Sequence, residues 1–169
     1  VPIYVNRSYN IPKWVDKKTL VLASSYSGNT EETLSAFNQC KSAEAKIVVM
    51  TAGGELEDLA NINKLDYILF PSGLQPRAAL GLSVSFMLII LNKLGFASDS
   101  IIKELYSSID ILIKLCDKLS DCDDENPAVI LANEIHDMCP IIYGSEDLTW
   151  VAALRFKGQL EENAKMLAF

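Results

Sequence analysis

Short apolar runs alternate with segments of helical periodicity along the first 70 residues. The runs fall at 3–5, 19–24, 46–51 and 67–70, are rich in Val, Ile, Leu and Tyr, and are mostly bounded by polar residues or glycine, which predicts strands. Helices are expected between the later strands, at 33–40 and 57–62. Strands and helices that alternate at this spacing predict βαβ units. The expected fold is therefore α/β, with a doubly wound parallel sheet.

Two longer helices follow the predicted sheet. The segment 78–94 is strongly apolar, but it is shorter than a bilayer span requires and is interrupted by Gly81, Ser83 and Ser85. We therefore expect it to be buried in the domain core or in a subunit contact, and we expect no membrane partner. Apolar residues then recur at helical spacing from Ile101 to Leu119, which predicts a long amphipathic helix.

An acidic stretch at 121–126 interrupts this pattern and reads as a linker. Beyond it the βα alternation restarts, with a helix at 127–138, a strand at 140–143 and a helix at 148–166. One strand cannot form a sheet alone. We therefore predict a first domain at 1–120, the linker at 121–126, and the beginning of a second α/β domain at 127–169. The chain also opens on an apolar run without an initiator Met, which suggests a fragment.

Composition narrows the classes of function. The formal net charge is −7, which disfavours a general nucleic-acid binder, because affinity for the phosphate backbone needs clustered Lys and Arg. The four cysteines form no CxxC pair and there is one histidine, so metal ligation is not expected. The cysteines are predicted to be buried free thiols in a reducing compartment, which favours a cytoplasmic location.

The stretch 24–33 carries the strongest chemical signal. It joins a predicted strand to a predicted helix through a hydroxyl-rich turn with one glycine, Gly28. Ser25, Ser27 and Thr30 could donate hydrogen bonds to a phosphate, assisted by the unpaired N–H groups and partial positive charge of the helix N-terminus. The alternative is a plain connection in which Ser27 or Asn29 is the helix N-cap and Glu32 completes a capping box on Asn29.

The residues Ser-Tyr-Ser-Gly-Asn-Thr-Glu-Glu-Thr at 25–33 resemble the signature of the sugar isomerase (SIS) domain, a doubly wound α/β fold that binds phosphosugars. The preceding segment 9–15, and Ile-Ile-Tyr-Gly-Ser at 141–145, are similar to one branch, the bifunctional phosphoglucose/phosphomannose isomerases. The resemblance covers essentially the whole chain. It implies two fused SIS-type domains and an active site between them and a dimer partner, with the start of the first domain and most of the second absent here.

The resemblance also implies catalytic residues. Arg77, after Pro76, is similar to the arginine that steadies the enediolate intermediate in the family. The segment 155–165 resembles the one that carries the catalytic glutamate and places that base at Glu162; Glu161 stands where the family usually has a smaller polar residue, so both carboxylates remain candidates. Without the resemblance, Arg77 reads as a surface charge and 155–165 as a solvated helix face. His136 is expected to be a surface residue.

The function implied is an aldose–ketose isomerase that interconverts glucose 6-phosphate, and mannose 6-phosphate, with fructose 6-phosphate through a cis-enediol. No metal or organic cofactor is expected, and the expected partners are the phosphosugar and a second copy in a homodimer. The alternative is a non-catalytic, phosphosugar-binding regulatory SIS domain, which would need no glutamate at position 162. A ketose-aminating synthase half also stays open.

Overall fold

The computed structural model of the protein describes residues 2–169. The chain divides into two compact units, with the boundary between Ile102 and Lys103. No helix within 2–169 is long and apolar enough to cross a membrane.

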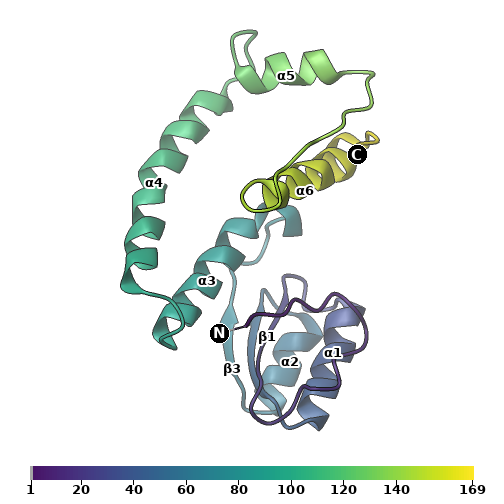
Figure 1. Ribbon diagram of the computed structural model, residues 1–169, viewed down its shortest axis with the longest axis vertical. Coiled ribbons are helices and arrows are strands. Elements are labelled where there is room, and N and C mark those ends of the chain that lie inside the picture. The colour runs from purple at the N-terminus through teal and green to yellow at the C-terminus, as the bar shows by residue number, and fades with distance from the viewer. Residues whose placement is uncertain (1) are drawn as a thin grey trace. The chain divides into compact units, whose positions relative to one another are not determined.

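The first unit is built on a three-stranded parallel sheet (Figure 1). Its strands are β1 (Leu20–Ser25), β2 (Lys46–Thr51) and β3 (Asp66–Leu69), hydrogen-bonded in the order β1-β2-β3. Helix α1 (Glu31–Ser42) connects β1 to β2, and helix α2 (Gly54–Ile62) connects β2 to β3. The predicted α/β fold with a parallel sheet is confirmed, and β2 has the bounds expected from its apolar run.

The core of this unit lies between the sheet and helices α1 and α2. The helices contribute Phe37, Cys40, Leu56 and Ala60, each at most 4% exposed, and they pack against Ala23, Ile47 and Val49 of the strands. These residues follow the two periodicities that place side chains on one face: steps of two in β2 and of three or four in the helices. Replacing a side chain such as Phe37 by Ala would cost about 3–5 kcal/mol.

Two helices follow the sheet in the sequence. The 3₁₀ turn η1 (Pro76–Ala78) leads into α3 (Leu80–Lys93), which is followed by α4 (Asp99–Ser120); the unit boundary falls inside α4. Both helices match the apolar patterns that predicted them. No residue of α3 is buried in this chain, and Leu80, Val84 and Met87 are exposed. Burial of α3 in the core of its own domain is therefore not what the structure shows.

The second unit contains the rest of α4 and three further helical elements. They are α5 (Pro127–Ile135), α6 (Trp150–Gln159) and the π-helical turn η2 (Leu160–Ala164). Asn126 is the N-cap of α5: its Oδ1 accepts from Ala128 N at 2.8 Å, and its side chain is nearly fully buried. Lys165 ends the π turn in a left-handed conformation, with φ +55°.

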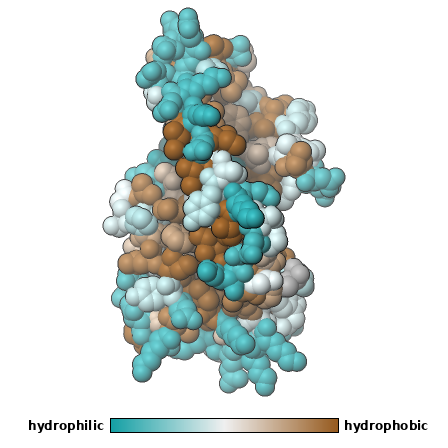
Figure 2. Space-filling model, turned by 90° about the vertical axis from the view of Figure 1, so that its left-hand side faces the viewer, coloured by the Kyte–Doolittle hydropathy of each residue, from teal (hydrophilic) through white to brown (hydrophobic). Residues whose placement is uncertain are grey.

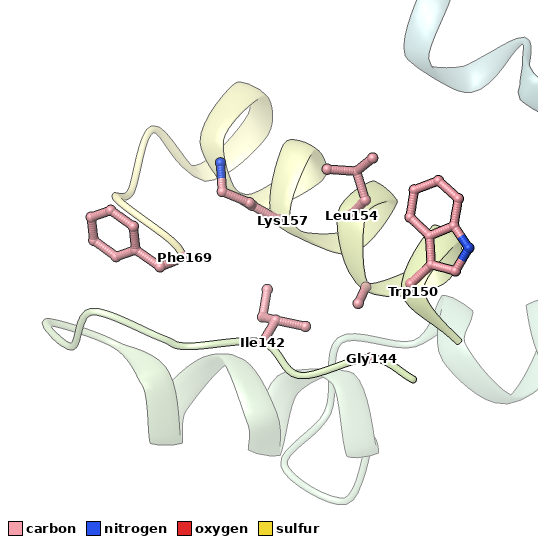
Figure 3. Close-up of a pocket in the computed structure, with 7 residues that line it drawn as sticks. Ile142, Gly144, Trp150, Leu154, Lys157 and Phe169 are labelled. Atoms are coloured by element: carbon pink, nitrogen blue, oxygen red, sulfur yellow. The ribbon is translucent and has the colours of Figure 1, made fainter. Parts of the chain in front are cut away.

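A hollow of about 230 Å³ separates α6 from the extended segment that precedes it. Figure 3 shows Ile142 projecting from this segment toward α6, with Phe169 at one end of the space and Trp150 at the other. Gly144 lies against the start of α6, where a Cβ would come within 2.7 Å of Trp150 Cα. A glycine is therefore needed at this position for the segment to approach the helix so closely.

Two strand predictions are wrong. Residues 3–5 are exposed and form no ladder, and residues 140–143 are also outside any sheet. In place of a neighbouring strand, the second segment pairs with the last residue: Phe169 N donates to Pro140 O at 3.0 Å, and Ile142 N donates to Phe169 O at 2.6 Å. An apolar, β-branched run becomes a strand only where another strand meets its backbone groups.

The prediction for the cysteines is wrong for three of the four. Cys40 is buried on α1, whereas Cys116, Cys122 and Cys139 are exposed. Cys116 lies on the long helix α4, where an exposed position is compatible with amphipathic spacing. Burial raises the pKa of the Cys40 thiol above its usual value, which disfavours its reactive thiolate form.

Hydrophobic side chains are also exposed along α4. Figure 2 shows brown patches of hydrophobic residues on the face it displays. The largest exposed apolar residues of α4 within the second unit are Tyr106, Ile109, Ile111, Leu112, Ile113, Leu115 and Leu119. A surface with so many neighbouring apolar side chains is typical of a buried contact in a larger assembly.

Candidate functional site

Three loops leave the sheet at the carboxyl ends of its strands. They are the loop of 25–30 after β1, that of 51–54 after β2, and that of 70–77 after β3. Ligands of open α/β sheets bind at this edge. Four of the five predicted site residues lie in these loops, namely Ser25, Ser27, Thr30 and Arg77.

The first loop is folded around the Ser25 hydroxyl. This side chain is 7% exposed, and its Oγ lies 2.8 Å from Thr30 Oγ1. Ser25 Oγ also accepts from Gly28 N at 3.1 Å. Ser27 is exposed, and its Oγ accepts from Asn29 N at 3.3 Å. The loop therefore brings Ser25 and Thr30 into direct contact, with Ser27 on the exposed side of the same turn.

Helix α1 begins directly after this loop. Its N-cap is Thr30, whose hydroxyl makes no capping hydrogen bond and is paired with Ser25 instead. The alternative prediction of a cap at Ser27 or Asn29 is therefore wrong. The backbone N–H groups of the first turn have no partner within the helix and carry the positive end of its dipole. Hydroxyls and N–H donors thus converge at one helix end, as anion binding requires.

Asn29 forms a hydrogen bond with the neighbouring helix α2. Its Oδ1 accepts from Glu55 N at 3.0 Å, in the first turn of α2. The same contact brings the two loops close together: a Cβ on Gly54 would lie 2.7 Å from Asn29 Oδ1 and 2.4 Å from Ser27 O. This role of Asn29 was not predicted from the sequence. The adjacent glycines Gly53 and Gly54 after β2 could have indicated that another segment approaches the backbone closely here.

Gly28 fits between these two loops. Its φ is +70°, and a Cβ there would stand 1.7 Å from Gly53 O and 2.9 Å from Thr51 Oγ1. The carbonyl of Gly28 accepts from Leu56 N at 3.0 Å, and Ala52 N donates to Tyr26 O at 2.9 Å. Position 28 thus requires glycine, both for its positive φ and for its close approach to Gly53. Together with the two backbone hydrogen bonds, this contact joins the first two loops into one interlocked structure.

The third loop is attached through Tyr26. The Tyr26 hydroxyl donates to Pro71 O at 2.8 Å and accepts from Leu74 N at 2.9 Å. Arg77 follows in η1 and is exposed. This role of Tyr26 could not be predicted from the signature, because its partners lie 45 and 48 residues away.

Charge near the candidate site is mixed. Glu31 and Glu32 occupy the first turn of α1, where the helix dipole favours acidic side chains. Tyr9 Oη donates to Glu31 Oε2 at 3.1 Å, and this hydrogen bond raises the pKa of the Tyr9 phenol above its ordinary value of 10.0. A bound phosphate would therefore depend on directed N–H and O–H donors more than on net positive charge.

The predicted base lies in the second unit. Glu162 is an exposed residue of the π turn η2, whereas Glu161 is half-buried and forms an ion pair with Lys157, with Nζ to Oε1 at 2.8 Å. An uninterrupted α-helix was expected here. A π turn has more residues per turn, so it changes the angular offset between Glu162 and Arg155. Such turns occur frequently at functional sites.

Two other predictions concern this part of the chain. In the amide orientation that satisfies both groups, Gln159 accepts from Arg155 Nη2 at 2.7 Å and from Nε at 3.2 Å. Arg155 is thus hydrogen-bonded to Gln159 on the same helix. His136 is exposed, as expected, and its Nδ1 lies 3.1 Å from Asp137. Within residues 2–169 no cluster of three metal-ligating side chains is found.

Comparison with known proteins agrees with these features. Residues 124–169 match the family model of the bacterial phospho-glucose isomerase C-terminal SIS domain. This segment therefore belongs to a sugar isomerase (SIS) domain family, and the chain as a whole resembles SIS-domain proteins. It is similar over its whole length to the bifunctional phosphoglucose/phosphomannose isomerase of Caldicellulosiruptor bescii, with 43% identity over 171 residues.

Two further relatives bear on the reaction. The bifunctional phosphoglucose/phosphomannose isomerase of Thermoplasma acidophilum is 39% identical over 99% of this chain. The D-glucosamine-6-phosphate 4-epimerase of Sulfolobus acidocaldarius is 34% identical over 96% of it. The chain covers 50%, 49% and 49% of these three relatives, so it spans about half the length of the curated relatives it matches.

Proposed function

We propose that the protein is an aldose–ketose isomerase that interconverts glucose 6-phosphate and mannose 6-phosphate with fructose 6-phosphate. The observation that carries the proposal is the interlocked hydroxyl loop at the N-terminus of α1, at the carboxyl edge of a parallel sheet. The similarity to phosphoglucose/phosphomannose isomerases supports the same reaction class.

Ser25, Ser27 and Thr30 are proposed to bind the phosphate of the sugar. The contact between Ser25 and Thr30, at 2.8 Å, supports this role because it fixes two hydroxyls before any ligand arrives. The hydrogen bonds from Gly28 and Asn29 to the serine hydroxyls hold the turn in one shape. Each hydrogen bond to a charged phosphate contributes about 1.5–3 kcal/mol.

Arg77 is proposed to stabilise the enediolate. Anchoring of the phosphate at the first loop leaves the reacting carbons at the other end of the sugar, and the third loop leaves the same edge of the sheet. A guanidinium stays charged at any pH at which the protein is folded and donates in a fixed fork. It would therefore stabilise negative charge that develops on the oxygens in the transition state.

Glu162 is proposed to move the proton between C1 and C2 through the cis-enediol. A carboxylate is ionised at neutral pH, so it can accept a carbon-bound proton and return it to the neighbouring carbon. The ion pair between Glu161 and Lys157 supports the choice of Glu162 as the base, because Glu161 would have to break this pair before it could reach the substrate. The position of Glu162 in a π turn agrees with a functional role.

We propose a homodimer in the cytoplasm as the working form. The apolar residues of α3 and α4 that are exposed in this chain support a large protein contact. We also propose the domain division 1–120, 121–126 and 127–169. The family match that begins at residue 124 supports a second SIS-type domain that starts near the linker.

The test uses the full-length protein and two matched carboxylate variants. Glu162→Gln keeps the shape and removes the basicity, so it should lower kcat about 10²–10⁴-fold and leave substrate affinity nearly unchanged. Glu161→Gln should stay close to wild type, since it removes only a partly exposed ion pair. Isomerisation of fructose 6-phosphate in deuterated water should place deuterium at C2 of the aldose product. An active Glu162→Gln enzyme, or an inactive Glu161→Gln one, would contradict the assignment.

The similarity to the 4-epimerase favours one second candidate, an epimerase acting on an amino sugar phosphate. Product analysis with glucosamine 6-phosphate separates the two reactions. The regulatory alternative predicts binding of fructose 6-phosphate without turnover of any of these sugars. Conversion of glucose 6-phosphate to fructose 6-phosphate by the wild type, lost in Glu162→Gln, would exclude both.

A further inference from the structure

Tyr26 lies inside the signature loop, but its side chain is bonded to a different loop. Its hydroxyl is within 2.8 Å of Pro71 O, to which it donates, and within 2.9 Å of Leu74 N, from which it accepts. One phenol oxygen thus fixes two backbone groups of the loop that leads to Arg77. Its own backbone carbonyl accepts from Ala52 N, so the same residue contacts all three loops at the edge of the sheet.

An aromatic stack holds the Tyr26 ring in place. The ring lies against Phe70, with centroids 6.3 Å apart and an interplanar angle of 24°. Phe70 in turn stacks on Phe86 of α3 at 5.4 Å and 14°. Phe70 is 2% exposed, so the middle member of the stack is fixed by the core. The Tyr26 hydroxyl therefore projects from a rigid base toward a loop that is exposed from Pro71 to Ala78.

We propose that Tyr26 is a positioning residue that sets the place of Arg77 relative to the phosphate-binding hydroxyls. The proposal rests on the proposed function. The substrate has its phosphate at one end and its reacting carbons at the other, so the distance between the two subsites must match one molecule. Tyr26 is adjacent in sequence to both Ser25 and Ser27, and its hydroxyl holds the chain three residues before Arg77. A displacement of a reacting group by about 1 Å can cost on the order of 10²-fold in rate.

Tyr26→Phe isolates this role. It keeps the ring and its stack on Phe70 and removes only the oxygen that holds Pro71 and Leu74. The phosphate-binding hydroxyls stay where Gly28, Asn29 and Thr30 hold them. Binding of inorganic phosphate should therefore change by less than about twofold, whereas kcat for fructose 6-phosphate should fall about 10–100-fold. Tyr67→Phe, which removes the hydroxyl of an exposed tyrosine on β3, is the matched control and should match wild type in both.

Two measurements separate positioning from a general loss of structure. Amide hydrogen exchange at Leu74 should become about five- to tenfold faster in Tyr26→Phe, as expected for the loss of one hydrogen bond. In a double-mutant cycle with Arg77→Ala, Tyr26→Phe should have little further effect on kcat, because its action depends on Arg77. Additive effects on kcat, or weakened phosphate binding equal to the fall in kcat, would overturn the proposal.

The exchange measurement also distinguishes this inference from the proposed function. If the wild-type protein turns over none of the sugars, the proposed function fails, and faster exchange at Leu74 in Tyr26→Phe would still support the positioning of the loop. If the wild type is an isomerase and Leu74 exchanges equally in both proteins, the positioning role is wrong and the proposed function stands.

Discussion

Replacement of Gly28 by alanine tests the interlocked loops directly. The new Cβ would stand 1.7 Å from Gly53 O, which is a backbone atom and cannot rotate away. Relief requires movement of the Gly53 peptide, whose carbonyl accepts from Thr51 Oγ1 at 2.7 Å. The alanine must also adopt φ +70°, the left-handed region that costs a residue with a Cβ about 1–2 kcal/mol.

These effects add to a large loss of stability. Overpacking contributes about 1–3 kcal/mol and the disturbed hydrogen bond about 1 kcal/mol, beyond the cost of the backbone conformation. Gly73→Ala is a matched control: Gly73 has φ +94°, but no atom lies within 4 Å of the position that the alanine methyl group would take. It should show the conformational cost alone.

The assay is denaturant unfolding of both variants under the same conditions. Gly28→Ala should lower the free energy of unfolding by about 2–4 kcal/mol more than Gly73→Ala, at an unchanged denaturant slope. Folded Gly28→Ala should also lose affinity for inorganic phosphate, since Gly28 N holds the Ser25 hydroxyl. Equal destabilisation by the two variants would refute the contact between the loops as the reason for this glycine.

Two further predictions concern the same loop and the helix after it. Replacing Ser27 and Thr30 together by Ala should weaken phosphosugar binding by about 1–3 kcal/mol in calorimetry, and an unchanged affinity with an intact fold would rule the assignment out. Tyr9 should make stability depend on pH in the alkaline range, because its hydrogen bond to Glu31 raises the pKa of the folded phenol above 10.0. A raised pKa gives a contribution that is complete below the unfolded value and is lost as pH rises through the folded value. The difference in unfolding midpoint between wild type and Tyr9→Phe should therefore shrink above pH 10; a difference that stays constant would contradict this.

The sequence predicted the elements whose patterns are local. The apolar run of β2 matches its strand residue for residue, and the helical spacing of α4 matches a helix of 22 residues. The segments 3–5 and 140–143 were wrongly predicted as strands. A strand needs a neighbouring strand to pair with its backbone groups, and a single run of residues does not show whether that neighbour is present. The π turn at Leu160–Ala164 likewise has no composition that marks it in advance.

The candidate site was predictable only as far as its residues are neighbours in sequence. Ser25, Ser27, Gly28 and Thr30 share one turn, so their convergence could be expected. The contacts of Asn29 with α2 and of Tyr26 with Pro71 and Leu74 join segments that are 26 to 48 residues apart. Those partners depend on the order of strands in the sheet and on loop conformations, which the local pattern does not specify.

The hydrogen bond from Leu74 N to the Tyr26 hydroxyl also affects the order in which this unit can fold during synthesis on the ribosome. The residues proposed to bind phosphate, at 25–30, are translated before the loop of 70–77 to which the Tyr26 hydroxyl is bonded. Helix α1 and its hydroxyl loop therefore emerge from the exit tunnel well before the edge of the sheet can close around them. Contacts that span so many residues form late, because chain entropy must first be lost over the intervening segment. A nascent chain that ends before β3 would carry the signature without the loop that is proposed to place Arg77 relative to it.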